Sequence, residues 1–304
     1  MNRRKNQKNS SMKKRGMNIK QVIGGLAILL LAVACKEDID LKLKNTAPIF
    51  VVDGRITTDT TTHVVRLTMS ADYFSNQSVP PVSGAKVTID DGQQLIQLSE
   101  SNEEPGFYLT PSDYFGLPGR TYKLKIEDVD TNNDGQSEIY EAQSTLQPVN
   151  DIDSIDYEYD DVNKVWKVFL YAQDIPDRED YYMWAVAKND SLVSDQYSEL
   201  VTTSDEFFDG NYAKRVWVQS IEEEDEDGDV KITIKDGDWI KLYMGGVTLK
   251  FHEYLEAVDE ETGFKNPMFS GPPANVPTNI SNGALGYFTA YSVVSDSIQV
   301  QENK

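Results

Sequence analysis

The chain has 304 residues and carries 29 Lys and Arg against 50 Asp and Glu, a formal net charge of -21. Basic residues are concentrated before residue 21, where eight of them lie without a single acid, so the rest of the chain has 21 basic and 50 acidic residues, a net charge of -29. Such a surface repels nucleic acid and attracts cations and basic partners, which excludes nucleic acid as a partner. A chain of this length exceeds one typical core and predicts about two domains.

Cysteine and histidine are too scarce for several kinds of chemistry. Cys35 is the only thiol, so no disulfide can form within the chain, and no thiolate metal site or further cysteine nucleophile is available. His63 and His252 are the only histidines, which leaves little from which to build a zinc site or a Ser-His-Asp triad.

Residues 1–34 have the pattern of a cleavable signal peptide. A basic segment precedes the apolar run Val22 to Ala34, which has thirteen residues and is too short to cross a bilayer core of about 30 Å as a helix. Met12 and Met17 are alternative translation starts. The run ends in LAVAC, which resembles a lipobox, although Ala32 stands where leucine is more usual. We therefore expect cleavage before Cys35 and lipidation of Cys35; the alternative is an uncleaved N-terminal anchor.

Residues 35–46 form the expected lipidated tether. Lys36, Glu37 and Asp38 follow the cysteine directly and resemble the surface-export signal of Bacteroidota lipoproteins. This resemblance implies a location on the outer face of the outer membrane, held there by the lipid anchor. The alternative is an ordinary acidic tether, of the kind that lets a domain stand away from its membrane.

Residues 47–148 are expected to form a β-sandwich domain. Short runs rich in Val, Ile, Thr and Tyr are separated by turn residues at regular intervals. In 121–127 (TYKLKIE), apolar and charged residues alternate with the period of a half-buried strand. Further strands are predicted at 48–57, 63–70, 85–92, 107–113 and 139–146. The pattern favours an immunoglobulin-like sandwich, and the segment VSGAKVTI resembles pre-albumin-like modules, which usually act as scaffolds or binding units.

Residues 149–304 are expected to form a second β-rich domain, because the Pro- and Asp-rich stretch after Pro148 separates two strand-rich regions. Strands are predicted at 152–160, 166–174, 181–189, 215–221, 230–236, 239–245 and 286–300. The aromatic run at 181–184 is typical of a core. Residues 247–258 change period, with apolar residues spaced i, i+3, i+4 and i+7, and predict one amphipathic helix.

The segment from Asn266 through PPANVPTNISNGALGYFTAYS is the most distinctive in the chain. Together with the lipobox and the segments PIFVVDGRIT, VSGAKVTI and QPVNDIDSI, it resembles an uncharacterised Bacteroidota lipoprotein family, the domain of unknown function four-two-four-nine. The resemblance covers nearly all of the expected mature chain. It implies an outer-membrane lipoprotein, often encoded near TonB-dependent transporters, and it supplies no catalytic residues. The loop before the last strand is expected either to wrap the fold or to present a surface to a partner.

One motif has the spacing of a calcium-binding loop. The segment DTNNDGQSEIYE offers Asp130, Asn132, Asp134, the Gln136 carbonyl and Glu141, in the pattern that supplies oxygens to Ca²⁺. The flanking residues predict strands, whereas an EF-hand needs helices. A solvated hairpin tip is therefore the alternative, since Asn-Asp-Gly also favours a turn.

A second acidic run, Glu222 to Asp229, is read as a solvated loop. Paired carboxylates for hydrolysis could be drawn from these acids, but no G-x-S-x-G, P-loop or G-x-G-x-x-G motif is present. We therefore expect a non-enzymatic binding or accessory subunit of a TonB-dependent nutrient-uptake system. No cofactor is expected to be required, and calcium at the loop is the one candidate. The alternatives are a structural or assembly lipoprotein of the envelope and a carboxylate-based hydrolase. The sequence does not name the nutrient.

Overall fold

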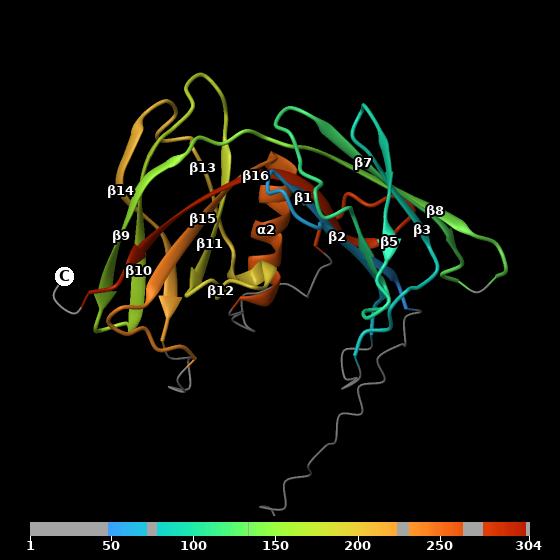
Figure 1. The fold of residues 1–304 in the computed structure, drawn as a ribbon, viewed down its shortest axis with the longest axis horizontal. Coiled ribbons are helices and arrows are strands. Elements are labelled where there is room, and N and C mark those ends of the chain that lie inside the picture. The colour runs from blue at the N-terminus through green and yellow to red at the C-terminus, as the bar shows by residue number, and fades with distance from the viewer. Residues whose placement is uncertain (1–47, 72–77, 133, 224–230, 264–275, 302–304) are drawn as a thin grey trace, which may run out of the picture. The chain divides into compact units, whose positions relative to one another are not determined.

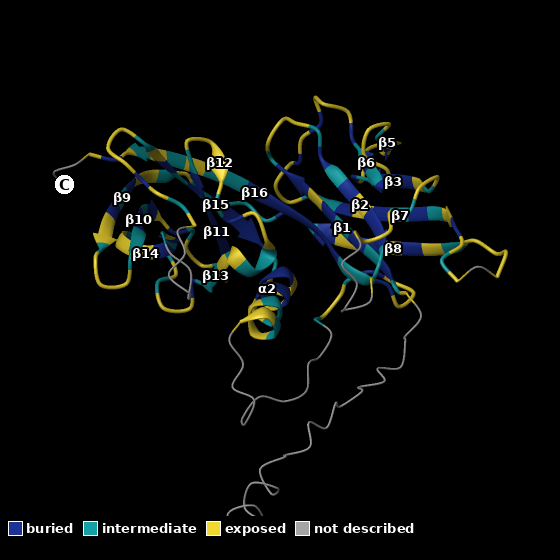
Figure 2. Cartoon of the chain, turned by 90° about the horizontal axis from the view of Figure 1, so that it is seen from below, coloured by how far each residue is buried: buried dark blue, intermediate teal, exposed yellow. Residues whose placement is uncertain are grey.

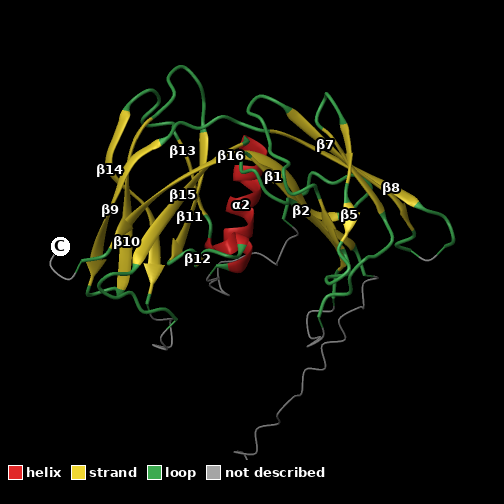
Figure 3. Ribbon diagram, in the orientation of Figure 1, coloured by secondary structure: helices red, strands yellow, loops and turns green. Residues whose placement is uncertain are grey.

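The computed structural model describes residues 48–71, 78–132, 134–223, 231–263 and 276–301. These residues form mostly β-strands, and one α-helix lies among them (Figure 3). The mostly-β fold class predicted from the sequence is therefore confirmed. Ala47–Lys304 is one compact unit of the chain. No helix within the described ranges is long and apolar enough to cross a bilayer.

The described strands belong to three sheets (Figure 1). The strands are β1 (Phe50–Thr57), β2 (Val64–Met69), β3 (Lys86–Asp90), β4 (Leu95–Gln97), β5 (Ser99–Glu100), β6 (Phe107–Leu109), β7 (Thr121–Val129), β8 (Glu138–Thr145), β9 (Ile152–Asp160), β10 (Val165–Gln173), β11 (Tyr181–Lys188), β12 (Ser191–Leu192), β13 (Val201–Ser204), β14 (Tyr212–Glu222), β15 (Trp239–Val247) and β16 (Leu285–Gln299). The largest sheet has the order β12-β11-β15-β16-β1-β2-β6-β5, with β13 paired to β11; the others are β4-β3-β7-β8 and β14-β10-β9.

Strand β16 lies in the middle of the largest sheet and joins its two halves. Its first half, from Leu285 to Tyr291, pairs in parallel with β1, and its second half, from Ser292 to Gln299, pairs antiparallel with β15. Parallel strands need a long connection, and here nearly the whole described chain lies between the partners. The predicted domain boundary falls between β8 and β9, while β16 pairs with strands from both sides of it. The division into two domains stays a prediction.

The first hydrophobic core lies between the β4-β3-β7-β8 sheet and the β1-β2 part of the largest sheet. In β7, Tyr122, Leu124 and Ile126 are buried and Lys123 is exposed, as the period-two pattern predicts. These side chains belong to the same cluster as Val52 and other buried residues of β1, β2 and β16. Figure 2 shows the buried residues along these strands. Two sheet faces therefore pack against each other here.

The second core lies between the β14-β10-β9 sheet and the β11–β15 part of the largest sheet. Val168 and Leu170 of β10 are buried in one cluster with Trp184 of β11 and Leu242 of β15. The side chains of the predicted aromatic run alternate between the two faces of β11. Tyr182 and Trp184 belong to this second core, and Tyr181 and Met183 pack in a third cluster on the other face. Burying a large apolar side chain contributes about 1.5–3 kcal/mol.

Helix α2 (Leu249–Thr262) confirms the helix predicted at 247–258. The Thr248 side chain caps it by accepting a hydrogen bond from the Phe251 amide at 3.3 Å. Phe251, Tyr254 and Leu255 are buried, and they pack in the third cluster with Tyr287 and other residues of β16. Because Phe288, the next residue of β16, faces the first core, α2 covers the opposite face of the largest sheet.

The strand predicted at 230–236 is wrong for the part that the structure describes. Residues 231–235 carry no strand assignment. Ile234 is buried and Ile232 half-buried against the second core, which explains the alternating pattern. Within the described residues 231–235 no ladder with a neighbouring strand forms. The segment instead makes single contacts, such as the hydrogen bond from the Lys231 amide to the Glu223 carbonyl at 2.8 Å.

Candidate functional site

An apolar cavity of about 280 Å³ lies within the second core. Its walls come from β10, β11, β13, β14 and β15, so it lies between two sheets. Ligand pockets in proteins begin at about 300 Å³ and are mostly apolar. The cavity therefore has room for a single ring or a short apolar group.

Aromatic side chains form one wall of the cavity. Tyr182 lies 5.8 Å from Trp184 and 6.4 Å from Phe208 between ring centroids, and the pair with Phe208 is stacked. The Trp184 indole nitrogen donates a hydrogen bond to the Thr203 hydroxyl at 3.1 Å. This bond holds the indole in one orientation across β11 and β13. The wall therefore consists of packed aromatic rings, and one of them is fixed by a hydrogen bond.

The opening of the cavity lies along β14, which is an edge strand of the three-stranded sheet. Tyr212, Val216 and Trp217 line the cavity and are 47%, 43% and 57% exposed, while the lining residues from β11 are buried. The pairing of β14 with β10 shifts register twice, and Arg215 at one shift has a φ of 53°. Bulges bend an edge strand and re-aim its side chains. Here the bulges lie in the strand that supplies the exposed lining residues of the cavity.

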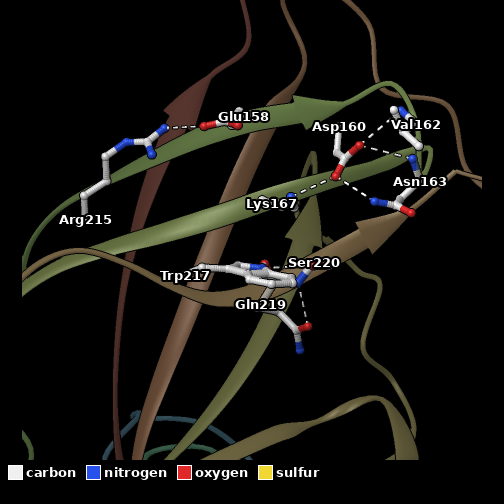
Figure 4. Close-up of polar contacts among 9 residues, drawn as sticks. All are labelled: Glu158, Asp160, Val162, Asn163, Lys167, Arg215, Trp217, Gln219 and Ser220. Carbon is white, nitrogen blue, oxygen red and sulfur yellow. Dashed lines mark hydrogen bonds and ion pairs between the residues drawn. The ribbon is translucent and has the colours of Figure 1, made fainter.

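A polar network on the outer face of the same sheet fixes the bulged strand (Figure 4). Arg215 donates to Glu158 at 2.8 Å, and its guanidinium also stacks 4.0 Å from the centre of the Phe169 ring. The Trp217 indole nitrogen donates to the Ser220 hydroxyl at 3.1 Å, and the Lys167 ammonium lies 5.1 Å from the Trp217 ring centre. These contacts hold Arg215 and Trp217 of β14 in place in the structure without a ligand.

A fixed carboxylate stands at one end of the cavity. Asp174 is buried; one oxygen accepts a hydrogen bond from the Tyr182 hydroxyl, and the other accepts one from the Gly210 amide at 2.7 Å. Burial, together with Asp174, raises the pKa of Tyr182 well above its usual range, so the phenol stays protonated and donates. The arrangement offers a largely apolar volume whose lining includes a carboxylate held by two hydrogen bonds.

The comparison with protein families supplies the identification. Residues 36–297 match the family described as Domain of unknown function (DUF4249). The chain belongs to this family. The match includes the cavity, the first core and all of the second core except Ile298 and Val300. A search of the curated proteins finds no match for this DUF4249 chain.

Four predicted site residues of the DUF4249 chain lie outside the described residues. They are the predicted lipidation site Cys35 and the predicted export signal, Lys36, Glu37 and Asp38. Their roles stay predictions. The same holds for residues 224–229 of the acidic run and for residues 266–275 of the distinctive loop.

The predicted calcium loop connects β7 and β8, so its flanks are strands, as the sequence predicts. Asp130, Asp134 and Glu138 form a group in which one carboxylate oxygen from each residue lies within 4.8 Å of the other two. Glu141 is not part of that group; it lies within β8, paired with Lys125.

Oxygens within this loop already accept backbone bonds. Asp130 accepts from the Gly135 amide at 2.9 Å, Asn132 from the Asp134 amide at 2.8 Å, and Asp134 from the Gln136 amide at 2.8 Å. These bonds stabilise a turn without any ion. Calcium at Asp130, Asn132, Asp134, Gln136 and Glu141 stays a prediction.

Sequence reasoning missed the cavity and Asp174. The strand predicted at 166–174 ends at Asp174, and the sequence predicts no function for that residue. A signal was present in the segment QDIPDREDYY at 173–182, where four acids surround a proline turn between two strands. Which of these acids would be buried could not be read from the sequence.

Proposed function

We propose that the mature protein begins at a lipidated Cys35 and is a surface-exposed, outer-membrane binding subunit, without enzymatic activity, of a TonB-dependent nutrient-uptake system. The observation that carries the binding role is the apolar cavity of about 280 Å³, which has aromatic walls and opens along the bulged edge strand β14. The predicted lipobox and the Lys36-Glu37-Asp38 segment support the location. The ligand would carry a ring or short apolar group.

We also propose a finer description of the fold. Residues 47–148 would form an immunoglobulin-like or pre-albumin-like sandwich, and residues 149–304 a second β-rich domain. The second core, which comes wholly from residues 149–304, supports this division, while the first core combines residues 50–146 with residues of the second region such as Phe288 and Ala290. The shared strand β16 would make the two domains move as one body, because breaking it would cost main-chain hydrogen bonds to both β1 and β15.

Two other functions remain as rivals. A structural or assembly lipoprotein of the envelope would need no ligand in the cavity, and its deletion would weaken the envelope in general. A binding subunit would instead affect growth on one nutrient. A carboxylate-based hydrolase would need a pair of carboxylates facing a substrate cleft; the cavity favours binding because both oxygens of Asp174 are held by Tyr182 and Gly210.

Filling the cavity is expected to abolish binding of a small aromatic probe. Ala172 is 4% exposed and lines the cavity from β10, so Ala172→Phe would place a ring in the space that a ligand needs. We expect the full chain to bind 4-fluorophenol, followed by ¹⁹F NMR, and A172F to bind it at least about tenfold more weakly, which corresponds to about 1.4 kcal/mol.

The matched control is Val162→Phe, which adds a ring in the turn between β9 and β10, where Val162 is 89% exposed. V162F is expected to bind the probe as the unaltered chain does. Overpacking costs about 1–3 kcal/mol, so circular dichroism must first show that A172F is folded. No binding by the unaltered chain, or equal binding by A172F, would rule out the cavity as the ligand site.

A further inference from the structure

Three buried carboxylates from different parts of the chain converge beside the cavity. Asp174 follows β10, Asp180 precedes β11 and Asp205 follows β13. One oxygen from each lies within 4.8 Å of the other two. The three residues are 4%, 5% and 1% exposed, so all are more than nine-tenths buried. Carboxylates are rarely buried in this way unless they are paired or bind a metal.

Two of the carboxylate oxygens have no hydrogen-bond partner. Asp180 accepts a bond from the Arg178 guanidinium at 2.6 Å through Oδ1, but its Oδ2 has no donor. Oδ2 of Asp205 is buried and has none either. An unsatisfied buried polar atom costs about 1–3 kcal/mol, and more when it is charged. Both atoms belong to the same converging group, so one ligand could satisfy both.

The charge of the group also requires compensation. Three ionised carboxylates face one guanidinium, Arg178, which leaves two negative charges unbalanced. Like charges held this close together repel each other, and their burial removes the water that would screen them. The ionised group is therefore unstable by itself, and it would be stabilised by a cation of charge two.

An acidic cleft of about 590 Å³ gives access to this group from the side of α2. Its lining includes Asp205 and Arg178 of the group itself. The other acids that line it are Asp177, Glu179, Glu206, Asp209, Glu253 and Glu256. A cleft lined by one sign of charge raises the local concentration of the opposite ion. The cleft would therefore direct cations to the buried carboxylates.

We propose that Asp174, Asp180 and Asp205 bind a divalent cation, with calcium as the ion that fits best. Calcium binds oxygen ligands at about 2.3–2.6 Å, so two oxygens on one ion lie at most about 5 Å apart. The three carboxylates meet this requirement, and they offer only hard oxygen donors. The ion would tie together the end of β10, the start of β11 and the end of β13. It stands apart from the predicted loop at Asp130, and it does not depend on the proposed function.

The test uses calcium with the full chain purified in detergent and stripped with EGTA. We expect calcium to raise the melting temperature and to bind in calorimetry. Terbium, a luminescent stand-in for calcium, should be sensitised by Tyr182, which is hydrogen-bonded to Asp174. Asp205→Asn keeps the shape of the side chain and removes one charge, and we expect it to weaken the sensitised binding at least about tenfold. Asp180→Asn should do the same, which guards against one variant failing to fold.

The matched control is Asp113→Asn, which removes the same charge at an exposed position outside the cleft. D113N is expected to bind terbium and calcium as the unaltered chain does. Asp130→Asn separates the two candidate sites. The proposal is overturned if stripped protein shows neither a calcium-dependent melting shift nor binding, since the carboxylates would then share protons. It is equally overturned if binding survives in D205N and D180N but is lost in D130N.

Discussion

Replacing Gly286 with alanine is expected to lower the free energy of unfolding by more than about 4 kcal/mol, enough to unfold many domains. Gly286 lies in β16 opposite Val52 of β1 and has a φ of 90°. A Cβ atom at this position would lie 2.0 Å from the Val52 carbonyl oxygen. The strained backbone alone costs about 1–3 kcal/mol, and relief of the contact would separate β16 from β1. Urea denaturation followed by circular dichroism measures the loss.

Gly283→Ala is the matched control for this prediction. Gly283 also has a positive φ, 75°, but a Cβ atom there would have no neighbour within 4 Å. G283A should therefore lose only the strain of the left-handed backbone, about 1–2 kcal/mol. If G286A and G283A lose the same amount, the close parallel approach of β1 and β16 is not as described.

Replacing Phe251 with alanine is expected to cost about 3–5 kcal/mol. Phe251 is 1% exposed and is the centre of the cluster that fixes α2 to the largest sheet. Its ring centroid lies 5.1 Å from that of Tyr287, 5.8 Å from Tyr254 and 6.1 Å from Tyr197. The alanine variant would leave a cavity among three tyrosine rings that cannot collapse without moving β16. Thermal and urea unfolding give the change in stability.

The control for Phe251 is Phe207→Ala, which makes the same change at a side chain that is 90% exposed. F207A is expected to change stability by less than about 0.5 kcal/mol. A loss in F251A no larger than that in F207A would mean that α2 does not pack on the sheet through this ring.

The sequence predicted a helix or strand correctly where apolar residues recur at the spacing that places them on one buried face. The alternation of TYKLKIE became β7, and the spacing of Phe251, Tyr254 and Leu255 became the buried face of α2. The same alternation at Ile232 and Ile234 gave a wrong strand, since a pattern reports burial and says nothing about whether a neighbouring strand is free to pair. The parallel pair β1 and β16 could not be predicted, because no local pattern records a partner more than two hundred residues away.

The candidate sites show the same difference. The predicted calcium loop was found by spacing, and spacing identifies only ligands that are adjacent in sequence. Asp174 and Asp180 lie at the two ends of the connection between β10 and β11, and Asp205 joins them only through the pairing of β11 with β13. The cavity could not be predicted either, because it lies beside the bulges in β14. One of these bulges has Arg215 at a positive φ, and arginine is not a residue type from which a positive φ is predicted.

The most direct test of the account is mass spectrometry of the protein affinity-purified from its native membranes in mild detergent. The account predicts an N-terminal peptide that begins at Cys35 and carries a diacylglyceryl group, together with peptides of a co-purifying TonB-dependent transporter. An intact N-terminus containing Val22 to Ala34, or an unmodified Cys35, would contradict the lipid anchor on which the proposed location depends. Recovery of a lipidated protein with no transporter would contradict the accessory role.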